Sequence, residues 1–149
     1  MSSTEAAATS LPKSTLDQQR AARAVQCIDK LMNDCDTADQ DNYAGEAKRL
    51  PVRIMASGLG QAMAFINAKA ANRGGLKRLH SDLTAWVIRD QAKRIFASES
   101  LNEDSLLHSV IRGDSEFLRW ATTETLAFLQ WLNRFAEANS LGKREGENS

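Results

Sequence analysis

Positively charged side chains gather in the middle third of this 149-residue chain. Residues 48–94 hold ten Lys or Arg against two acidic residues, a net charge of +8, whereas residues 1–47 and 95–149 each carry −4. The whole chain is neutral, so the excess is local. Such a segment is typical of a surface that binds the phosphates of a polyanion, although solvated helix faces that bind nothing have the same composition.

Several of these cations are spaced for one helix face. Residues four positions apart in a helix are neighbours, and three pairs have this spacing: Arg49 with Arg53, Lys69 with Arg73, and Arg89 with Lys93. Asp90 can neutralise Arg94 at the same spacing, so Arg94 is left out. The nine candidate nucleic-acid-binding residues are Lys48, Arg49, Arg53, Lys69, Arg73, Lys77, Arg78, Arg89 and Lys93.

Residue patterns that perform catalysis are sparse. The two histidines, His80 and His108, fall on different expected helices, and no metal-ligand, nucleophile-elbow or Walker motif occurs. His80 lies on an apolar stripe, where a packing role is more common than acid–base chemistry. Gly58-Leu59-Gly60 precedes a helix, but Met63 replaces the third small residue of a dinucleotide-binding loop, which favours an interhelical turn. We therefore predict no enzyme activity, no catalytic residue, no metal and no cofactor.

Two residue types could carry other chemistry. Cys27 and Cys35 are eight positions apart on one expected helix, which separates their Cα atoms by about 12 Å and predicts two reduced thiols. Trp131 shares an apolar face with Phe128 and Phe135 and is predicted to lie in the core. Trp120 could either pack in the core or stack on a nucleic-acid base.

The elements that position these side chains are predicted to be helices. Leu and Ala together number 38, whereas Val and Ile number 10, and the chain has two Pro. This ratio favours helix over sheet. Apolar residues also recur at three- and four-residue steps through most of the chain. We predict an all-α fold, a compact bundle of five to six helices in a single domain.

Capping and turn residues predict where the first helices begin and end. Thr15 and Gln18 fit a capping box at the start of the first helix, which ends in an acidic loop over residues 34–41. A second helix is expected from Asp41 or Asn42, and Pro51 either kinks it or begins a new one.

The later helices have similar boundaries. We expect helices over residues 59–72 and 76–96, then a short helix capped by Asn102, closed by Gly113 and holding Ile111 on its apolar face. The last and longest helix is expected to begin at Asp114 or Ser115, with Leu118 and Phe135 among its inward residues.

The predicted domain limits follow from these boundaries. Residues 1–13 and 139–149 are expected to be disordered tails around a helical domain over residues 14–138. No stretch approaches 18 apolar residues, and the first residues lack the pattern of a signal peptide. We therefore expect no membrane association and a cytoplasmic location.

Three motifs, in order, resemble one family. Tyr43-Ala44-Gly45-Glu46-Ala47-Lys48-Arg49-Leu50-Pro51, followed by Ser57-Gly58-Leu59-Gly60-Gln61-Ala62-Met63-Ala64-Phe65, is similar to the "AKxLP…GLGQALAF" signature of the small helical subunit of the type III-B CRISPR effector, the Cmr complex. Residues 123–136 resemble its "xEALxLLxWLKRFA" helix, with Asn133 in place of a Lys, and Arg20-Ala21-Ala22-Arg23-Ala24 also fits. The resemblance covers about residues 20–138.

The resemblance implies a non-catalytic subunit of an RNA-guided antiviral complex. Its expected partners are guide and target RNA, contacted through the backbone, the other subunits of the Cmr complex and further copies of itself. In such complexes base pairing reads the sequence and protein holds the backbone. Two other hypotheses stay open: a helical protein-interaction module without RNA binding, and a small hydrolase that assembles distant residues.

Overall fold

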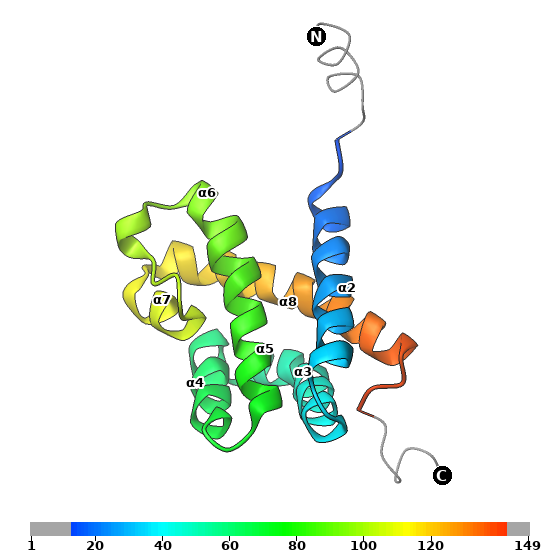
Figure 1. The fold of residues 1–149 in the computed structure, drawn as a ribbon. Helices are drawn as coiled ribbons and strands as arrows, with labels where there is room; N and C mark the ends of the chain where they lie inside the picture. The colour runs from blue at the N-terminus through cyan, green and yellow to red at the C-terminus, as the bar shows by residue number, and fades with distance from the viewer. Residues whose placement is uncertain (1–12, 143–149) are drawn as a thin grey trace, which may run out of the picture.

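The structure, a computed structural model, describes residues 13–142 (Figure 1). Its six α-helices of at least seven residues are α2 (Leu16–Asp34), α3 (Thr37–Ser57), α4 (Leu59–Ala70), α5 (Gly74–Thr84), α7 (Leu106–Arg112) and α8 (Ser115–Ala138). Helix α5 continues directly into the π-helix η1 (Ala85–Ala92) and α6 (Lys93–Ile95), and the 3₁₀ turn η2 (Ser98–Ser100) follows. Residues 13–142 include no strand, which confirms the predicted all-α class and number of helices.

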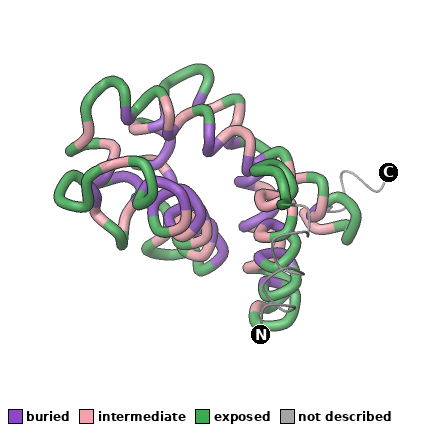
Figure 2. Tube along the Cα trace, turned by 90° about the horizontal axis from the view of Figure 1, so that it is seen from above, coloured by how far each residue is buried: buried purple, intermediate pink, exposed green. Residues whose placement is uncertain are grey.

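Helix α8 organises the core. It packs against α2 and α3, and α5 packs against α3 and α4 (Figure 1). Apolar residues from these helices form one buried cluster, which includes Ile28, Leu50, Leu83 and Phe128. Figure 2 shows the buried positions on the inward sides of the helices and the exposed positions on the outer sides and at the turns.

Most of the predicted helix starts are confirmed, and two are wrong. The capping box of Thr15 and Gln18 is present, and Asp114 caps α8. Helix α3 begins at Thr37, not near Asp41, because the Asp36 carboxylate accepts a hydrogen bond from the backbone N–H of Asp39 and caps the helix. The acidic segment is therefore mostly helical, with a short break at residues 35–36.

The second wrong start is that of α7, which Ser105 caps instead of Asn102. The Asn102 side chain accepts a hydrogen bond from the N–H of Asp104 and so makes a turn before the helix. Helix α7 buries Leu106, Leu107 and Ser109, whereas Ile111 lies on its outer side and is 66% exposed, so its predicted place on the apolar face is wrong. Leu118, near the start of α8, is also exposed, so its predicted inward position is wrong as well.

Pro51 lies inside α3 and does not begin a new helix. Proline has no N–H, so the Ala47 carbonyl cannot receive the usual helical hydrogen bond from position 51. The side-chain amide of Asn133, in α8, donates to that carbonyl at 3.0 Å. A residue 86 positions away thus supplies the hydrogen bond that the proline removes.

The predicted tails fall largely outside the described residues, which leaves the domain limits a prediction. Among residues 139–142, Leu141 packs against the core, and the N–H of Gly142 donates to the Asp41 carboxylate at 3.3 Å. Cys27 and Cys35 are free thiols, as predicted. Among the described helices, none combines the length and apolar character that a bilayer crossing requires.

Candidate nucleic-acid interface

The nine predicted cations occupy three parts of the structure. Lys48, Arg49 and Arg53 lie on α3, and Lys69, Arg73 and Lys77 lie at the turn between α4 and α5. Arg78, Arg89 and Lys93 follow along the continuous helix α5–η1–α6. The single basic segment of the sequence therefore becomes three sets with different surroundings.

On α3, two arginines are neutralised by a buried carboxylate. Glu46 has a side chain only 3% exposed, and its two oxygens accept hydrogen bonds from Arg49 at 3.3 Å and Arg53 at 3.1 Å. The Arg53 guanidinium also lies 3.8 Å from the centre of the Phe65 ring, a cation–π contact. The two arginines that the sequence spacing placed on one helix face therefore share an acidic partner on that same face.

The cations of the α5–η1–α6 helix are also held by acidic segments. Arg89 donates to the backbone carbonyl of Glu103 at 2.6 Å, and Lys93 lies 3.3 Å from the Glu103 carboxylate. Arg78 binds Asp34 at 3.3 Å and donates to the Cys35 sulfur at 3.7 Å. These three side chains hold a loop and the end of α2 in place.

The expected pairing of Asp90 with Arg94 is wrong. Asp90 instead forms an ion pair with Arg23 of α2. Within residues 13–142, Arg94 has no ion-pair partner and is exposed. The sequence spacing allowed the local pair, but the packing of α2 beside η1 brought a more distant arginine to the carboxylate.

The turn between α4 and α5 presents three exposed cations. Lys69, Arg73 and Lys77 make no ion pair with any residue that the structure describes, and all three are exposed. The Lys69 ammonium lies over the Phe65 ring, 5.1 Å from its centre. Because α4 ends at Ala70, Lys69 and Arg73 do not share one helix face as predicted, but flank one turn.

A carboxylate occupies the N-terminal end of α5 beside this turn. The Asp39 side chain accepts a hydrogen bond from the N–H of Gly75 at 3.2 Å. A Cβ at Gly75 would meet the Asp39 backbone oxygen at 2.3 Å, so this close approach requires glycine. A carboxylate of the chain itself therefore occupies this N–H group, which leaves the three side chains as the cationic groups of the turn.

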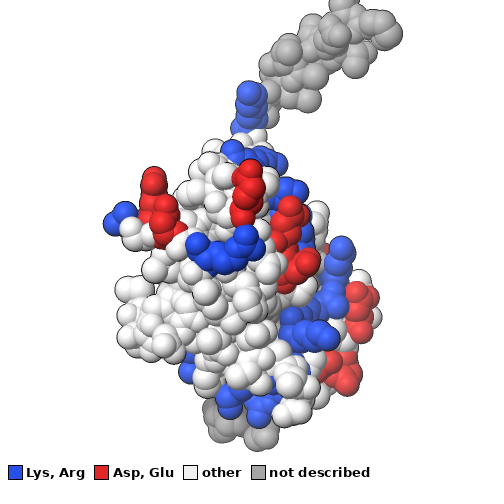
Figure 3. Space-filling view, turned by 90° about the vertical axis from the view of Figure 1, so that its left-hand side faces the viewer, with Lys and Arg blue, Asp and Glu red and all other residues white. Residues whose placement is uncertain are grey.

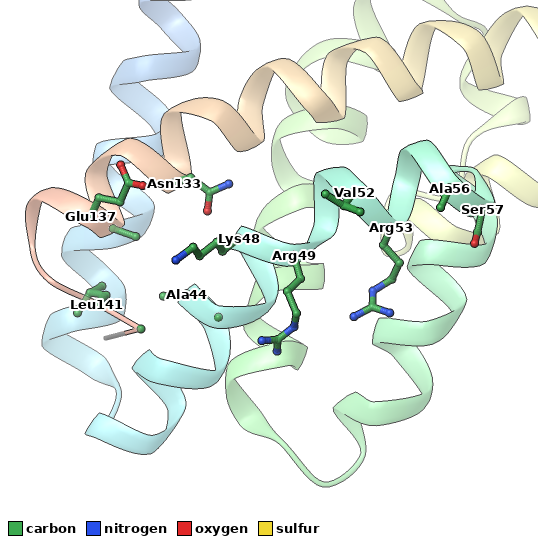
Figure 4. Close-up of a pocket in the computed structure, with 13 residues that line it drawn as sticks. Ala44, Lys48, Arg49, Val52, Arg53, Ala56, Ser57, Asn133, Glu137 and Leu141 are labelled. Atoms are coloured by element: carbon green, nitrogen blue, oxygen red, sulfur yellow. The ribbon is translucent and has the colours of Figure 1, made fainter. Parts of the chain in front are cut away.

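A groove of about 950 Å³ lies between α3 and α8 (Figure 4). Much of its lining is apolar or small, including Ala44, Val52, Ala56 and Leu141. Its polar lining residues are Lys48, Arg49, Arg53, Ser57, Asn133 and Glu137. Figure 4 shows Arg49 and Arg53 extending from α3 away from α8, whereas Asn133 and Glu137 come from α8.

The motif arginine at position 20 forms a buried ion pair that sequence reasoning missed. Arg20 binds both oxygens of Glu124 in α8, at 2.7 and 2.9 Å, and the Trp86 indole N–H donates to the same carboxylate at 2.8 Å. The pKa of the Arg20 guanidinium is raised above its usual value, chiefly by its hydrogen bonds with Glu124. Arg20 lies in the segment Arg20–Ala24 and Glu124 in residues 123–136, and both segments resemble the family. The presence of both residues in these motifs is the sequence feature that could have predicted the pair.

Two titratable groups on α5 are shifted by burial. Burial raises the pKa of Asp82, which accepts a hydrogen bond from the Tyr43 hydroxyl at 2.7 Å. The neighbouring Cys27 thiol has a pKa of about 12, raised mainly by burial and then by the Asp82 charge. Burial also lowers the pKa of His80, whose Nε2 atom has no hydrogen-bond partner in the described structure. His80 is half-buried, and its packing role stays a prediction.

Trp120, the candidate stacking residue, and Trp131 both pack against the core. Trp131 is half-buried, stacks on Phe135 at 5.8 Å between ring centres, and donates to Asp17 at 3.0 Å. Trp120 is also half-buried and packs edge-on to Phe96 at 5.3 Å. The fully enclosed tryptophan is Trp86, which stacks on Phe128.

Charge is distributed unevenly over the outer surface as well. Figure 3 shows the side of the molecule on which α4 and α7 lie. A broad area of this face carries no charged side chain, while Lys, Arg, Asp and Glu lie above it and to its right, and Lys or Arg lie below it. Between residues 13 and 142, no three His, Cys, Asp or Glu side chains are grouped to hold a metal ion.

Comparison with known proteins places the chain in a family. Residues 16–139 match the family model described as "CRISPR-associated protein (Cas_Cmr5)". The chain is also 31% identical over 115 residues to the "CRISPR system Cmr subunit Cmr5" of Thermus thermophilus, an alignment that covers 77% of this chain and 90% of the relative.

The chain therefore belongs to the Cmr5 family, the small helical subunits of the type III-B CRISPR effector. This membership confirms the family resemblance drawn from the three motifs. It also identifies the other subunits of the Cmr complex as the proteins with which the chain associates.

Proposed function

We propose that this subunit is a non-catalytic component that packs along the guide–target RNA duplex and contacts its phosphate backbone in antiviral defence. Several copies would line the duplex in the cytoplasm, each next to other Cmr subunits. Lys69, Arg73 and Lys77, the turn cations, would contact the phosphates. Guide pairing would supply sequence specificity, so these contacts need only backbone charge.

The observation that carries this proposal is the state of the turn cations. Phosphate binding releases condensed counterions and requires positive charge that the protein has not already neutralised. The turn cations are exposed and unpaired among the described residues, whereas Arg49, Arg53, Arg78 and Lys93 each bind a carboxylate. The remaining candidates become secondary phosphate contacts at most.

Packing between subunits is supported by the uncharged area in Figure 3. Charged residues are depleted at the centre of protein–protein interfaces relative to the rest of the surface. A broad area without charge would let one face of the subunit meet protein while the turn cations meet RNA.

The test compares target-RNA retention by the assembled effector with and without the turn charges. Lys69→Glu/Lys77→Glu should assemble but retain less target RNA, because repulsion replaces attraction at two phosphates. Lys30→Glu, a reversal of an exposed lysine on α2, is the matched control and should retain RNA normally. Equal retention by all three complexes would contradict the proposal and favour the protein-interaction module without RNA binding.

Cleavage activity is tested on the subunit alone. Purified chain incubated with target RNA, with and without divalent cations, should leave the RNA intact. Cleavage that depends on this chain would contradict the non-catalytic part of the proposal and favour the hydrolase hypothesis.

A further inference from the structure

The groove between α3 and α8 differs from the turn in its chemistry. Its lining combines a line of apolar residues, Ala44, Val52, Ala56 and Leu141, with polar and charged side chains. Its volume of about 950 Å³ is enough for several side chains of a partner. Burial of apolar side chains of a protein partner against these apolar residues is favourable. A sugar–phosphate backbone gains little free energy from the same contacts.

The groove is also less cationic than the sequence indicates. Arg49 and Arg53 share the buried negative charge of Glu46, and Glu137 adds a second negative charge from α8. With Lys48 included, these five residues carry a net charge of +1. Arg49 contacts Glu46 through one terminal nitrogen, at 3.3 Å, and keeps 60% of its side chain exposed. Because a guanidinium has five N–H donors, its outer N–H groups can add a hydrogen bond to a partner carboxylate even though its charge is shared with Glu46.

Two exposed apolar side chains extend this surface along α3. Val52 is 73% exposed and Met55 is 75% exposed, the highest values among the large apolar residues that the structure describes. They are three positions apart on one helix, so they are neighbours on its surface. Large apolar groups held in water beside a groove indicate a site that a partner covers.

We propose that the α3–α8 groove binds an amphipathic segment of a neighbouring effector subunit. Its apolar side chains fill the groove over Val52 and Ala56, and its acidic side chains face Arg49 and Lys48. This proposal rests on the proposed function, because it assumes that the chain acts as an effector subunit, and it assigns protein and RNA to different cations.

The experiment measures binding of the purified chain to a reconstituted effector that lacks only this subunit and has been treated with nuclease to remove target RNA. Val52→Glu/Met55→Glu should bind about tenfold more weakly or worse, because it removes apolar contact and repels acidic groups. Val52→Lys/Met55→Lys should bind more tightly than the Glu variant, because its positive charges attract the acidic side chains of the partner segment. Val25→Glu, the same change at an exposed valine on α2, should bind like the parent.

The outcomes separate this proposal from the RNA proposal. Normal binding by Val52→Glu/Met55→Glu overturns the groove proposal, and so does a variant that assembles normally yet loses target RNA. Normal binding by Lys69→Glu/Lys77→Glu, with loss of RNA, leaves the groove proposal intact and supports the RNA contacts. Circular dichroism of each variant confirms that the surface changes have left the fold unaltered.

A cross-linking readout identifies what occupies the groove. A photoreactive phenylalanine derivative at position 52 should cross-link to one subunit of the assembled effector, in a peptide that combines acidic and apolar residues. Cross-linking to RNA, to another copy of this chain, or to a basic peptide would overturn the proposed occupant.

Discussion

Glu46 shows how one residue changes the interpretation of a charged segment. In the sequence, Glu46 is an acidic residue just before ten cations. In the structure its side chain is buried and forms ion pairs with two of them, Arg49 and Arg53. A carboxylate buried this deeply needs partners, since an unpaired buried charge is strongly unfavourable. Arg49 and Arg53 are therefore part of the fold before they are part of any interface.

The first prediction concerns Arg53. Arg53→Glu should lower the free energy of unfolding by about 3 kcal/mol, because it places a second carboxylate beside buried Glu46 and removes the contact with Phe65. Urea unfolding measures the change. Lys69→Glu reverses a charge near the same ring but at an exposed position, and should stay within about 0.5 kcal/mol of the parent. Equal stability of both variants would contradict the structural role of Arg53.

The second prediction concerns His80 and pH. Its folded-state pKa is lowered below the ordinary 6.5, first by burial and then by His108. The unfolded chain therefore binds the proton more readily, so stability is full above about pH 6.5 and is lost as pH falls through the folded pKa. His80→Leu should reduce the difference in melting temperature between about pH 7.5 and about pH 5.5.

A control separates His80 from the acidic groups. His108→Gln removes only the secondary cause of the shift, so it should weaken the pH dependence partly and not abolish it. An unchanged pH dependence in His80→Leu would show that carboxylates alone account for the acid sensitivity.

At the scale of the elements, local signals predicted the helices well. The Thr15 capping box and the Asp114 cap depend on side chains within three residues of the N–H groups they bind, so the sequence contains the whole interaction. The start of α3 was missed because several acidic residues in one run can each cap, and only packing selects Asp36. The π-helix η1 had no local signal.

The third prediction tests the hydrogen bond across Pro51. Asn133→Ala should lower stability by about 1–2 kcal/mol, because the Ala47 carbonyl then has no donor from α8. In a Pro51→Ala background the same change should cost less, since the new N–H at position 51 can donate to that carbonyl. A double-mutant cycle on unfolding free energies measures the coupling. Additive effects would show that the two sites act independently.

The fourth prediction ranks two tryptophans. Trp86→Ala should lower stability by about 3–5 kcal/mol, because Trp86 is buried, stacks on Phe128 and donates to Glu124. Trp131→Ala should lower it by about 1–2 kcal/mol, because Trp131 is only half-buried and donates to an exposed carboxylate. Thermal unfolding gives the order, and a larger effect at Trp131 would contradict the observed burial.

At the scale of the whole molecule, the sequence predicted the basic region but not its division. The net charge of a sequence segment sums residues that are close in the chain. Whether a Lys or Arg is neutralised depends on the acidic residues that folding brings beside it. Arg78 meets Asp34 across 44 positions, and Asp90 meets Arg23 from another helix. The groove was not predictable for the same reason, because its walls come from α3 and the distant end of α8.

The last prediction uses salt to count phosphate contacts of the assembled effector. For single strands, the logarithm of affinity falls with the logarithm of salt at a slope of about −0.7 per neutralised phosphate. Lys69→Glu/Lys77→Glu should remove about two contacts from each copy of the subunit and flatten the slope by about 1.4 per copy. Target-RNA affinity measured across a salt series gives the slopes, with a scrambled-guide complex to subtract non-specific binding. The groove variant Val52→Lys/Met55→Lys, at conditions where it assembles, should keep the parent slope, because its changed residues lie where a protein segment binds. A flattened slope in the groove variant and a parent slope in the turn variant would reverse the assignment of RNA and protein to the two surfaces.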